Sequence, residues 1–160
     1  RRLIFSDDED RYRYIGTLVA ALRQYRWLCL AYCLMPNHVH LLIKTPETNL
    51  ASGMRYLHGR YAREFNERHG RTGHLFESRY GSSLVLHDNY LWVVAAYIAL
   101  NPVHAGLVDT PAAYLWSSHH ATVTGDGPSW LASAQLLEYF GGVGGDPRQR
   151  YAQFVDGQLT

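Results

Sequence analysis

Two histidines, His38 and His40, stand one valine apart at the head of the apolar stretch HVHLLIK, residues 38–44. On a β-strand, side chains two residues apart project from the same face, roughly 7 Å apart along the strand. Two imidazoles at that spacing can bind one metal ion, but two ligands rarely hold a divalent ion by themselves. The pair therefore predicts either a metal site with a third ligand from elsewhere or two half-exposed histidines bonded to their neighbours on a sheet face.

Tyr97 and Asn101 form a second group with chemical potential, in AAYIALNPVHAGLV, residues 95–108. They are four residues apart, which makes them neighbours on one face of a helix. An amide oxygen is a hard ligand suited to Mg²⁺ or Mn²⁺, and a phenol is a potential covalent nucleophile. The pairing is compatible with metal-assisted phosphoryl transfer. The alternative is a core tyrosine with a hydrogen-bonded hydroxyl, one of 12 tyrosines in the chain.

Hydrophobic spacing predicts the elements that must position these groups. The acidic stretch SDDED starts a helix over about 7–25, and WLCLAYCL with HVHLLIK, joined by the turn MPN, predicts a hairpin. Apolar residues three and four apart predict a helix over 49–69; Asp88 caps a further helix, which Pro102 prevents from continuing. The other expected elements are an extended segment at 74–86 and helical pieces near 112–121, 129–140 and 147–156.

This order of elements predicts an α+β fold, an antiparallel sheet with helices packed mainly on one face. A chain of 160 residues that is 47% hydrophobic is long enough for one core. We expect a main domain at 1–110 and a helical extension at 111–160 packed on it, a single compact domain overall. Cys29 and Cys33 lie roughly 13 Å apart in an extended strand, too far for a disulfide. Without a membrane-length apolar run or a signal peptide, a cytoplasmic protein is expected.

The net charge of +1 falls short of the strongly basic class of nucleic-acid binders. The charge is unevenly distributed, because residues 55–79 contain six arginines and three glutamates. Arginine suits bidentate phosphate contacts. Two of these arginines could instead form ion pairs along a helix, Arg60 with Glu64 and Arg63 with Glu67.

Three stretches, YCLMPNHVHLLIKTPE, GRYAREFNERHGRTGHLFESRY and YIALNPVHAGLV, resemble the signatures of the single-tyrosine HUH transposases, most closely the branch of REP-associated tyrosine transposases. The resemblance covers roughly residues 3–120. It implies a ferredoxin-like HUH nuclease fold and a single-stranded DNA endonuclease and strand transferase. It also implies that His38 and His40 bind a divalent ion, Mg²⁺ or Mn²⁺, that Tyr97 is the nucleophile, and that Asn101 occupies the position of the third ligand.

The resemblance further implies a partner, single-stranded DNA or the foot of a DNA hairpin, bound by a monomer or a homodimer. Arginines would contact the DNA backbone, and aromatic side chains would stack on exposed bases. The alternative for each arginine is a solvated surface charge or an ion pair. The candidate DNA contacts are Arg60, Arg63, Arg71, His74, Phe76, Arg79, Tyr80 and His104.

Three features depart from the family pattern. Members usually have a strand just before the first helix, and this sequence lacks it, which would expose a sheet edge. His104 stands where an arginine is more usual. The stretch WSSHHA also differs, and it leaves His119 and His120 without an assigned role.

Other functions stay open from the residues alone. A catalytically silent module descended from such a transposase would bind DNA hairpins without a metal and without a covalent link. A metal-dependent hydrolase of small phosphoesters would use His38, His40 and another histidine. Such an enzyme would want a second motif of the HxH, HxT or HExxH type, and the sequence offers only HAT, residues 120–122. If Tyr97 is not the nucleophile of a transposase, Tyr90 is the next candidate.

Overall fold

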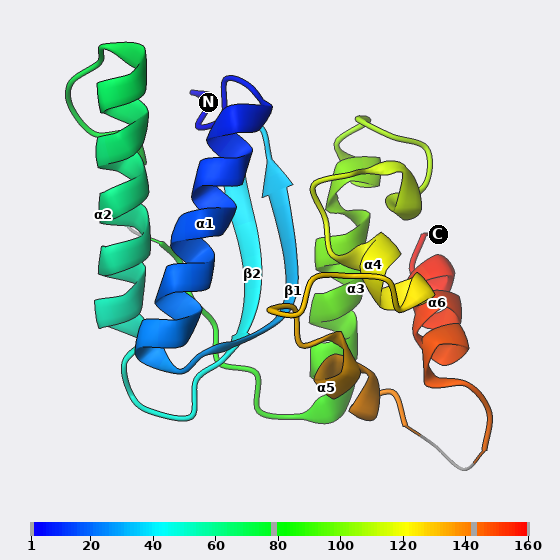
Figure 1. Cartoon of the computed structure of the whole chain (residues 1–160). Coiled ribbons are helices and arrows are strands. Elements are labelled where there is room, and N and C mark those ends of the chain that lie inside the picture. The colour runs from blue at the N-terminus through cyan, green and yellow to red at the C-terminus, as the bar shows by residue number, and fades with distance from the viewer. Residues whose placement is uncertain (1, 78–79, 142–143, 160) are drawn as a thin grey trace. The chain divides into compact units, whose positions relative to one another are not determined.

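The computed structural model describes residues 2–77, 80–141 and 144–159 (Figure 1). Its contacts divide into two compact units, one of residues 1–27, 36–38 and 44–83 and one of residues 28–35, 39–43 and 84–160. The described elements are helices together with a two-stranded sheet, so the predicted α+β class is confirmed. Because the units are groups of contacts rather than continuous segments, the expected division at residue 110 stays a prediction.

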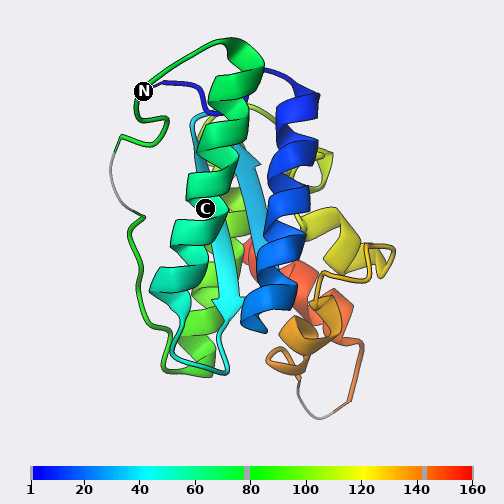
Figure 2. The same cartoon turned by 60° about the vertical axis from the view of Figure 1, so that its left-hand side comes forward.

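The first unit contains two helices that lie side by side, α1 (Asp8–Tyr25) and α2 (Leu50–His69) (Figures 1 and 2). The side chain of Asn49, just before α2, does not cap its own helix. Instead its oxygen accepts a hydrogen bond from the Trp27 indole at 2.8 Å, and its amide donates to the Tyr25 carbonyl at 2.9 Å. Asn49 therefore ties the start of α2 to the end of α1.

Aromatic rings fill the space between these helices. The ring of Tyr14 packs edge-on against Phe5 at 5.7 Å and against Tyr61 at 5.1 Å. The Tyr61 hydroxyl donates to the carbonyl of Ile4 at 2.5 Å. Because Phe5 and Ile4 precede α1, this cluster holds the N-terminal segment against both helices.

The second unit contains β1 (Leu28–Met35) and residues 39–43 of β2 (His38–Lys44), and these two strands form a hairpin (Figure 2). Paired strands joined by a two-residue turn must run antiparallel, as predicted. The far edge of β1 is paired with segments from the C-terminal third of the chain. The amide of Leu34 donates to Trp116, that of Ser118 to Tyr32, and that of Ala132 to Cys29, at 2.8–3.0 Å.

Helix α3 (Asp88–His104) packs on β1 and carries the core of this unit through Leu91, Ala95 and Ile98. Further short elements complete it. They are η1 (Pro111–Ala113), α4 (His119–Thr124), α5 (Ser133–Glu138) and α6 (Pro147–Gly157).

The structure departs from three expectations about elements. The extended segment expected at 74–86 does not pair as a strand of the sheet in its described residues, 74–77 and 80–86. The helix expected at 112–121 is interrupted, because the backbone of 116–118 pairs with β1 instead of continuing a helix. Helix α3 runs two residues past Pro102, since a proline this close to the end removes one hydrogen bond while the amide of Ala105 still bonds to the Asn101 carbonyl.

Both cysteines are buried and unbridged, as expected. Among the residues that the structure describes, no helix combines the length and apolarity needed to cross a lipid bilayer.

Candidate active site

Strand β2 carries the two histidines on one face. His38, His40 and Leu42 alternate along the strand, so their side chains project to the same side. Leu42 is buried and belongs to the core cluster that includes α3, which makes this the face of β2 directed toward α3. Val39, Leu41 and Ile43, on the opposite face, are only half-buried. The apolar core in this unit therefore lies on the histidine face of β2.

The ring of His38 is oriented by the residue before it. Its Nδ1 lies 2.6 Å from the side-chain oxygen of Asn37. A carbonyl oxygen can only accept a hydrogen bond, so this contact favours the tautomer of the neutral ring that carries the proton on Nδ1 and the lone pair on Nε2. Histidines that bind metals have this arrangement, in which the second nitrogen donates to an oxygen and fixes the ring. The chemistry of His38 therefore fits a metal ligand that binds through Nε2.

Tyr97 lies on the surface of α3 and touches His40. Its neighbours Ala96 and Ile98 are buried, whereas Tyr97 is 54% exposed. The rings of His40 and Tyr97 meet edge to face, with centroids 5.4 Å apart and an angle of 82° between the planes. A phenol that is both open to solvent and next to an imidazole is accessible to a large substrate such as DNA.

Asn101 follows Tyr97 by one turn of α3 and is half-buried. Among the described residues, no group of three or more histidine, cysteine, aspartate or glutamate side chains is placed to hold a metal ion. A cation bound by His40 would therefore need oxygen ligands as well, such as an amide oxygen or the oxygens of substrate and water. Mixed nitrogen and oxygen ligands of this kind are compatible with Mg²⁺ or Mn²⁺.

The candidate DNA contacts on α2 differ in their surroundings. Arg60 donates to Glu64 at 3.2 Å and lies 3.4 Å from the Tyr56 hydroxyl. Arg63 is exposed, and within the described part of the chain it forms no ion pair with Glu67. Of these two arginines, Arg63 is therefore the better placed for an external phosphate.

The candidates after α2 are placed as follows. Arg71 lies over the ring of Phe65 at 5.8 Å. Phe76 is stacked on His58, with centroids 4.2 Å apart and planes 11° apart, so a base could stack there only on its other face. The remaining candidates are exposed His74, half-buried Tyr80, exposed His104 at the end of α3, and Arg79, which lies outside the described residues.

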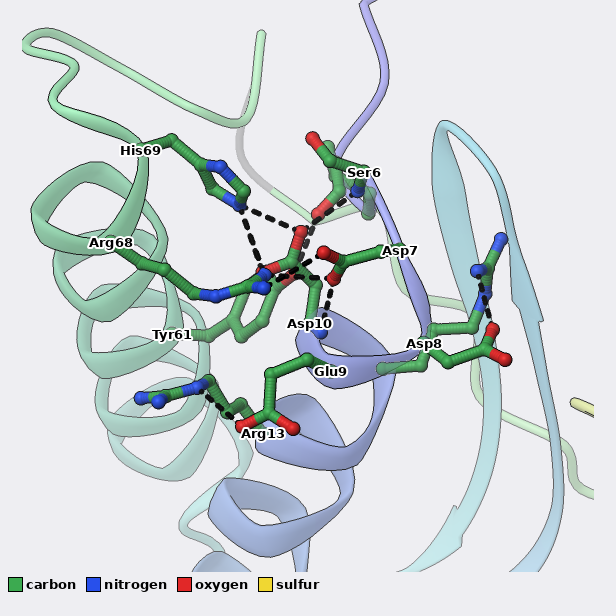
Figure 3. Close-up of polar contacts among 11 residues, drawn as sticks. Ser6, Asp7, Asp8, Glu9, Asp10, Arg13, Tyr61, Arg68 and His69 are labelled. Carbon is green, nitrogen blue, oxygen red and sulfur yellow. Dashed lines mark hydrogen bonds and ion pairs between the residues drawn. The ribbon is translucent and has the colours of Figure 1, made fainter.

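One charged cluster was missed by the sequence reasoning. At the end of α2, Arg68 donates to Asp7 and Asp10 at 2.7 Å, and His69 donates to Asp10 at 2.9 Å (Figure 3). Asp10 is buried and also accepts from the amide of Ser6 at 2.8 Å. The partners are about 60 residues apart in the chain, so no local pattern reveals them.

Electrostatics in this cluster follow from the contacts. The hydrogen bond from Arg68 lowers the pKa of Asp7 to about 2. Burial acts to raise the pKa of Asp10, but the hydrogen bonds from Ser6, His69 and Arg68 outweigh it, so the pKa lies below its usual value. Both carboxylates are therefore charged at neutral pH and hold α2 to the start of α1.

The unassigned His119 also has a structural role. It is buried, and its Nδ1 lies 2.9 Å from the Tyr151 hydroxyl of α6. Burial lowers the pKa of His119 to about 4, so the ring is neutral at physiological pH. Its neighbour His120 is exposed.

Comparison with known proteins gives two matches. The family model described as "Transposase IS200 like" matches residues 1–101, a range that includes His38, His40, Tyr97 and Asn101. A Haemophilus influenzae protein named "Putative REP-associated tyrosine transposase" is 29% identical over 125 residues, covering 69% of this chain and 71% of that protein. No solved structure matches.

Proposed function

The chain belongs to the IS200-like transposase family, and from that membership we propose that it cuts and rejoins single-stranded DNA through a covalent bond between Tyr97 and a 5′ phosphate. The observation that carries this proposal is the exposed phenol of Tyr97 against the ring of His40. Tyr97 thereby differs from Tyr14, Tyr61 and Tyr151, whose rings are buried in the core, and from exposed Tyr12, which lies on α1 rather than beside a histidine of β2.

The reaction is a transesterification. The Tyr97 oxygen attacks the scissile phosphorus and loses its proton, the bond from phosphorus to the 3′ oxygen breaks, and a free 3′-OH leaves. The products are a 5′-phosphotyrosine and a strand that ends in 3′-OH. Because one phosphodiester replaces another, a later 3′-OH can attack the phosphotyrosine and join two strands without a nucleotide cofactor.

His38, His40 and Asn101 are the residues that would hold a divalent cation, Mg²⁺ or Mn²⁺. When bound, such an ion neutralises charge on a non-bridging phosphate oxygen and orients the phosphate for in-line attack. Asn37 would orient the ring of His38 for this role, through the hydrogen bond at Nδ1.

We propose single-stranded DNA beside a hairpin as the substrate. The name of the Haemophilus influenzae relative links that protein to REP elements, and the resemblance described above implies hairpin DNA for this chain. Arg63 and Arg71 are our first candidates for contacts to the DNA backbone, because Arg60 is already engaged by Glu64.

The test uses hairpin oligonucleotides with randomised flanks, a fluorophore at the 3′ end, and Mg²⁺ or Mn²⁺. A 5′-phosphotyrosine retains the 3′ fragment, so the labelled DNA should migrate with the protein on a denaturing gel. The adduct should vanish in Tyr97→Phe and with a chelator, and persist in the control Tyr12→Phe, which changes an exposed tyrosine of α1. Hairpin binding without any adduct would indicate the silent module, and an adduct in Tyr97→Phe would refute Tyr97 as the nucleophile.

A further inference from the structure

Helix α3 presents a row of exposed side chains on the face that bears Tyr97. Tyr90 is 48% exposed, Val93 45% and Tyr97 54%, whereas Leu91 and Ala95 are buried. The exposed residues are three and four apart, the spacing of one helical face. We call Tyr90, Val93 and Tyr97 the α3 stripe.

The proposed function leaves Tyr90 without a task. The described structure gives its side chain no place in the core, and it lies two helical turns before Tyr97. Seven residues at about 1.5 Å each separate the two rings by about 10 Å along the helix axis. Asp88, the only acidic residue of α3, is two residues before Tyr90 and hence projects from nearly the opposite side of the helix. The stripe itself therefore offers aromatic surface without a negative charge.

We propose that Tyr90 is a stacking site for an unpaired base of the same DNA strand whose phosphate Tyr97 attacks. The inference rests on the proposed function, since Tyr97 can reach a phosphate only if the strand runs against this face of α3. Tyrosine rings bind successive bases of single strands by stacking, with little dependence on sequence.

The distance between the rings limits which base can be bound. Nucleotides stacked at about 3.4 Å per step along a strand cover the 10 Å from Tyr97 to Tyr90 in about three nucleotides, and a stretched strand covers it in fewer. The base on Tyr90 is therefore one to three nucleotides from the scissile phosphate. Tyr90 acts as a positioning residue that holds the strand in register with Tyr97.

The size of the stripe argues for a base rather than a second copy of the chain. A buried aromatic side chain contributes about 150–250 Å², so two half-exposed tyrosines and a valine offer roughly 250–300 Å². A stable protein interface needs about 800 Å² from each partner. One stacked base, in contrast, needs only one ring.

Binding is measured on the Tyr97→Phe background, which prevents covalent capture. The probe is a fluorescent hairpin oligonucleotide with 5-iododeoxyuridine in its unpaired flank. Adding Tyr90→Ala should weaken binding by roughly 5- to 150-fold, the range that base–aromatic stacking supplies, while Tyr90→Phe should retain it. Irradiation should cross-link the iodinated base to Tyr90, identified by mass spectrometry of the linked peptide. Circular dichroism should show that each variant is folded.

The matched control is Tyr12 of α1, which is 62% exposed and so more accessible than Tyr90. Tyr12→Ala should leave binding unchanged, and Tyr12 should cross-link less than Tyr90. Equal cross-linking of the two tyrosines, or equal binding by Tyr90→Ala and Tyr90→Phe, would overturn the inference. The inference would also be overturned if the protein were a dimer on gel filtration and Tyr90→Ala dissociated it. The α3 stripe would then bind a second copy of the chain, together with Leu84 and Leu86, which are exposed and nearby in the sequence.

The two proposals fail separately. If DNA forms an adduct with Tyr97 but the Tyr90 variants bind alike, only the stacking site is wrong. If no adduct forms with intact Tyr97 but the base still cross-links to Tyr90, the stacking site stands on a binding module and the proposed cleavage is wrong.

Discussion

Replacing Gly53 of α2 with alanine tests the packing that joins the two helices of the first unit. A Cβ at Gly53 would lie 2.0 Å from Cζ2 and 2.4 Å from Cη2 of Trp27, whereas carbon atoms in contact are normally about 3.5–4.0 Å apart. The indole cannot move away easily. It is buried, its N–H donates to Asn49 at 2.8 Å, and its ring lies 5.7 Å from that of Tyr25.

The expected magnitude is the difference between two opposing effects. Replacing glycine by alanine in a helix stabilises by about 0.5–1 kcal/mol, while overpacking a well-filled core costs about 1–3 kcal/mol. An overlap of about 1.5 Å relative to normal contact puts Gly53→Ala at the upper end of that cost. We expect a net loss of about 2 kcal/mol in the free energy of unfolding.

Gly59 of the same helix is the matched control, because it is exposed and its Cβ would meet no heavy atom within 4 Å. Gly59→Ala should gain about 0.5–1 kcal/mol, so the two variants should differ by roughly 3 kcal/mol. Urea unfolding, followed by circular dichroism and tryptophan fluorescence, should separate their midpoints by about 1–3 M for a typical dependence on urea. Equal midpoints, or a stabilised Gly53→Ala, would refute the packing of Trp27 on α2.

Three further predictions concern other parts of the chain. Burial lowers the pKa of His119 to about 4, so below about pH 6.5 the unfolded chain binds a proton that the folded chain does not. The free energy of unfolding should therefore fall by about 3 kcal/mol between pH 6.5 and 4. In His119→Gln this dependence on pH, measured by urea unfolding at each pH, should become weaker, and an unchanged dependence would contradict the prediction. Asp10→Asn should lower the free energy of unfolding by about 2 kcal/mol at pH 7 through weakened charged hydrogen bonds. The pKa of Asp10 is lowered in the folded state. The difference in free energy of unfolding between wild type and variant should therefore be complete above about pH 4 and vanish as the pH falls further. A difference that persists in acid would contradict the charged cluster. Asn37→Ala removes the hydrogen bond that orients His38. It should therefore raise the Mg²⁺ or Mn²⁺ concentration needed for half-maximal adduct formation by about 10- to 100-fold. An unchanged metal requirement would argue against His38 as a ligand.

Local sequence patterns were sufficient for the elements that position the site. The start of α1, the hairpin turn, the apolar stripe of α2 and most of α3 depend on caps, turns and side-chain spacing within a few residues. The same local geometry places His38 and His40 on one face of β2, and Tyr97 and Asn101 on one face of α3. Membership of the transposase family agrees with the motifs quoted for it.

Only the tertiary structure brought distant residues together. Sequence spacing could not reveal that Tyr97 is exposed yet touches His40, that segment 116–118 pairs with β1, or that Arg68 reaches Asp10. A helix or a turn closes hydrogen bonds over a few residues, so its own sequence specifies it. These other contacts join residues about 60 to 85 apart in the chain, and their formation depends on how all the intervening elements pack.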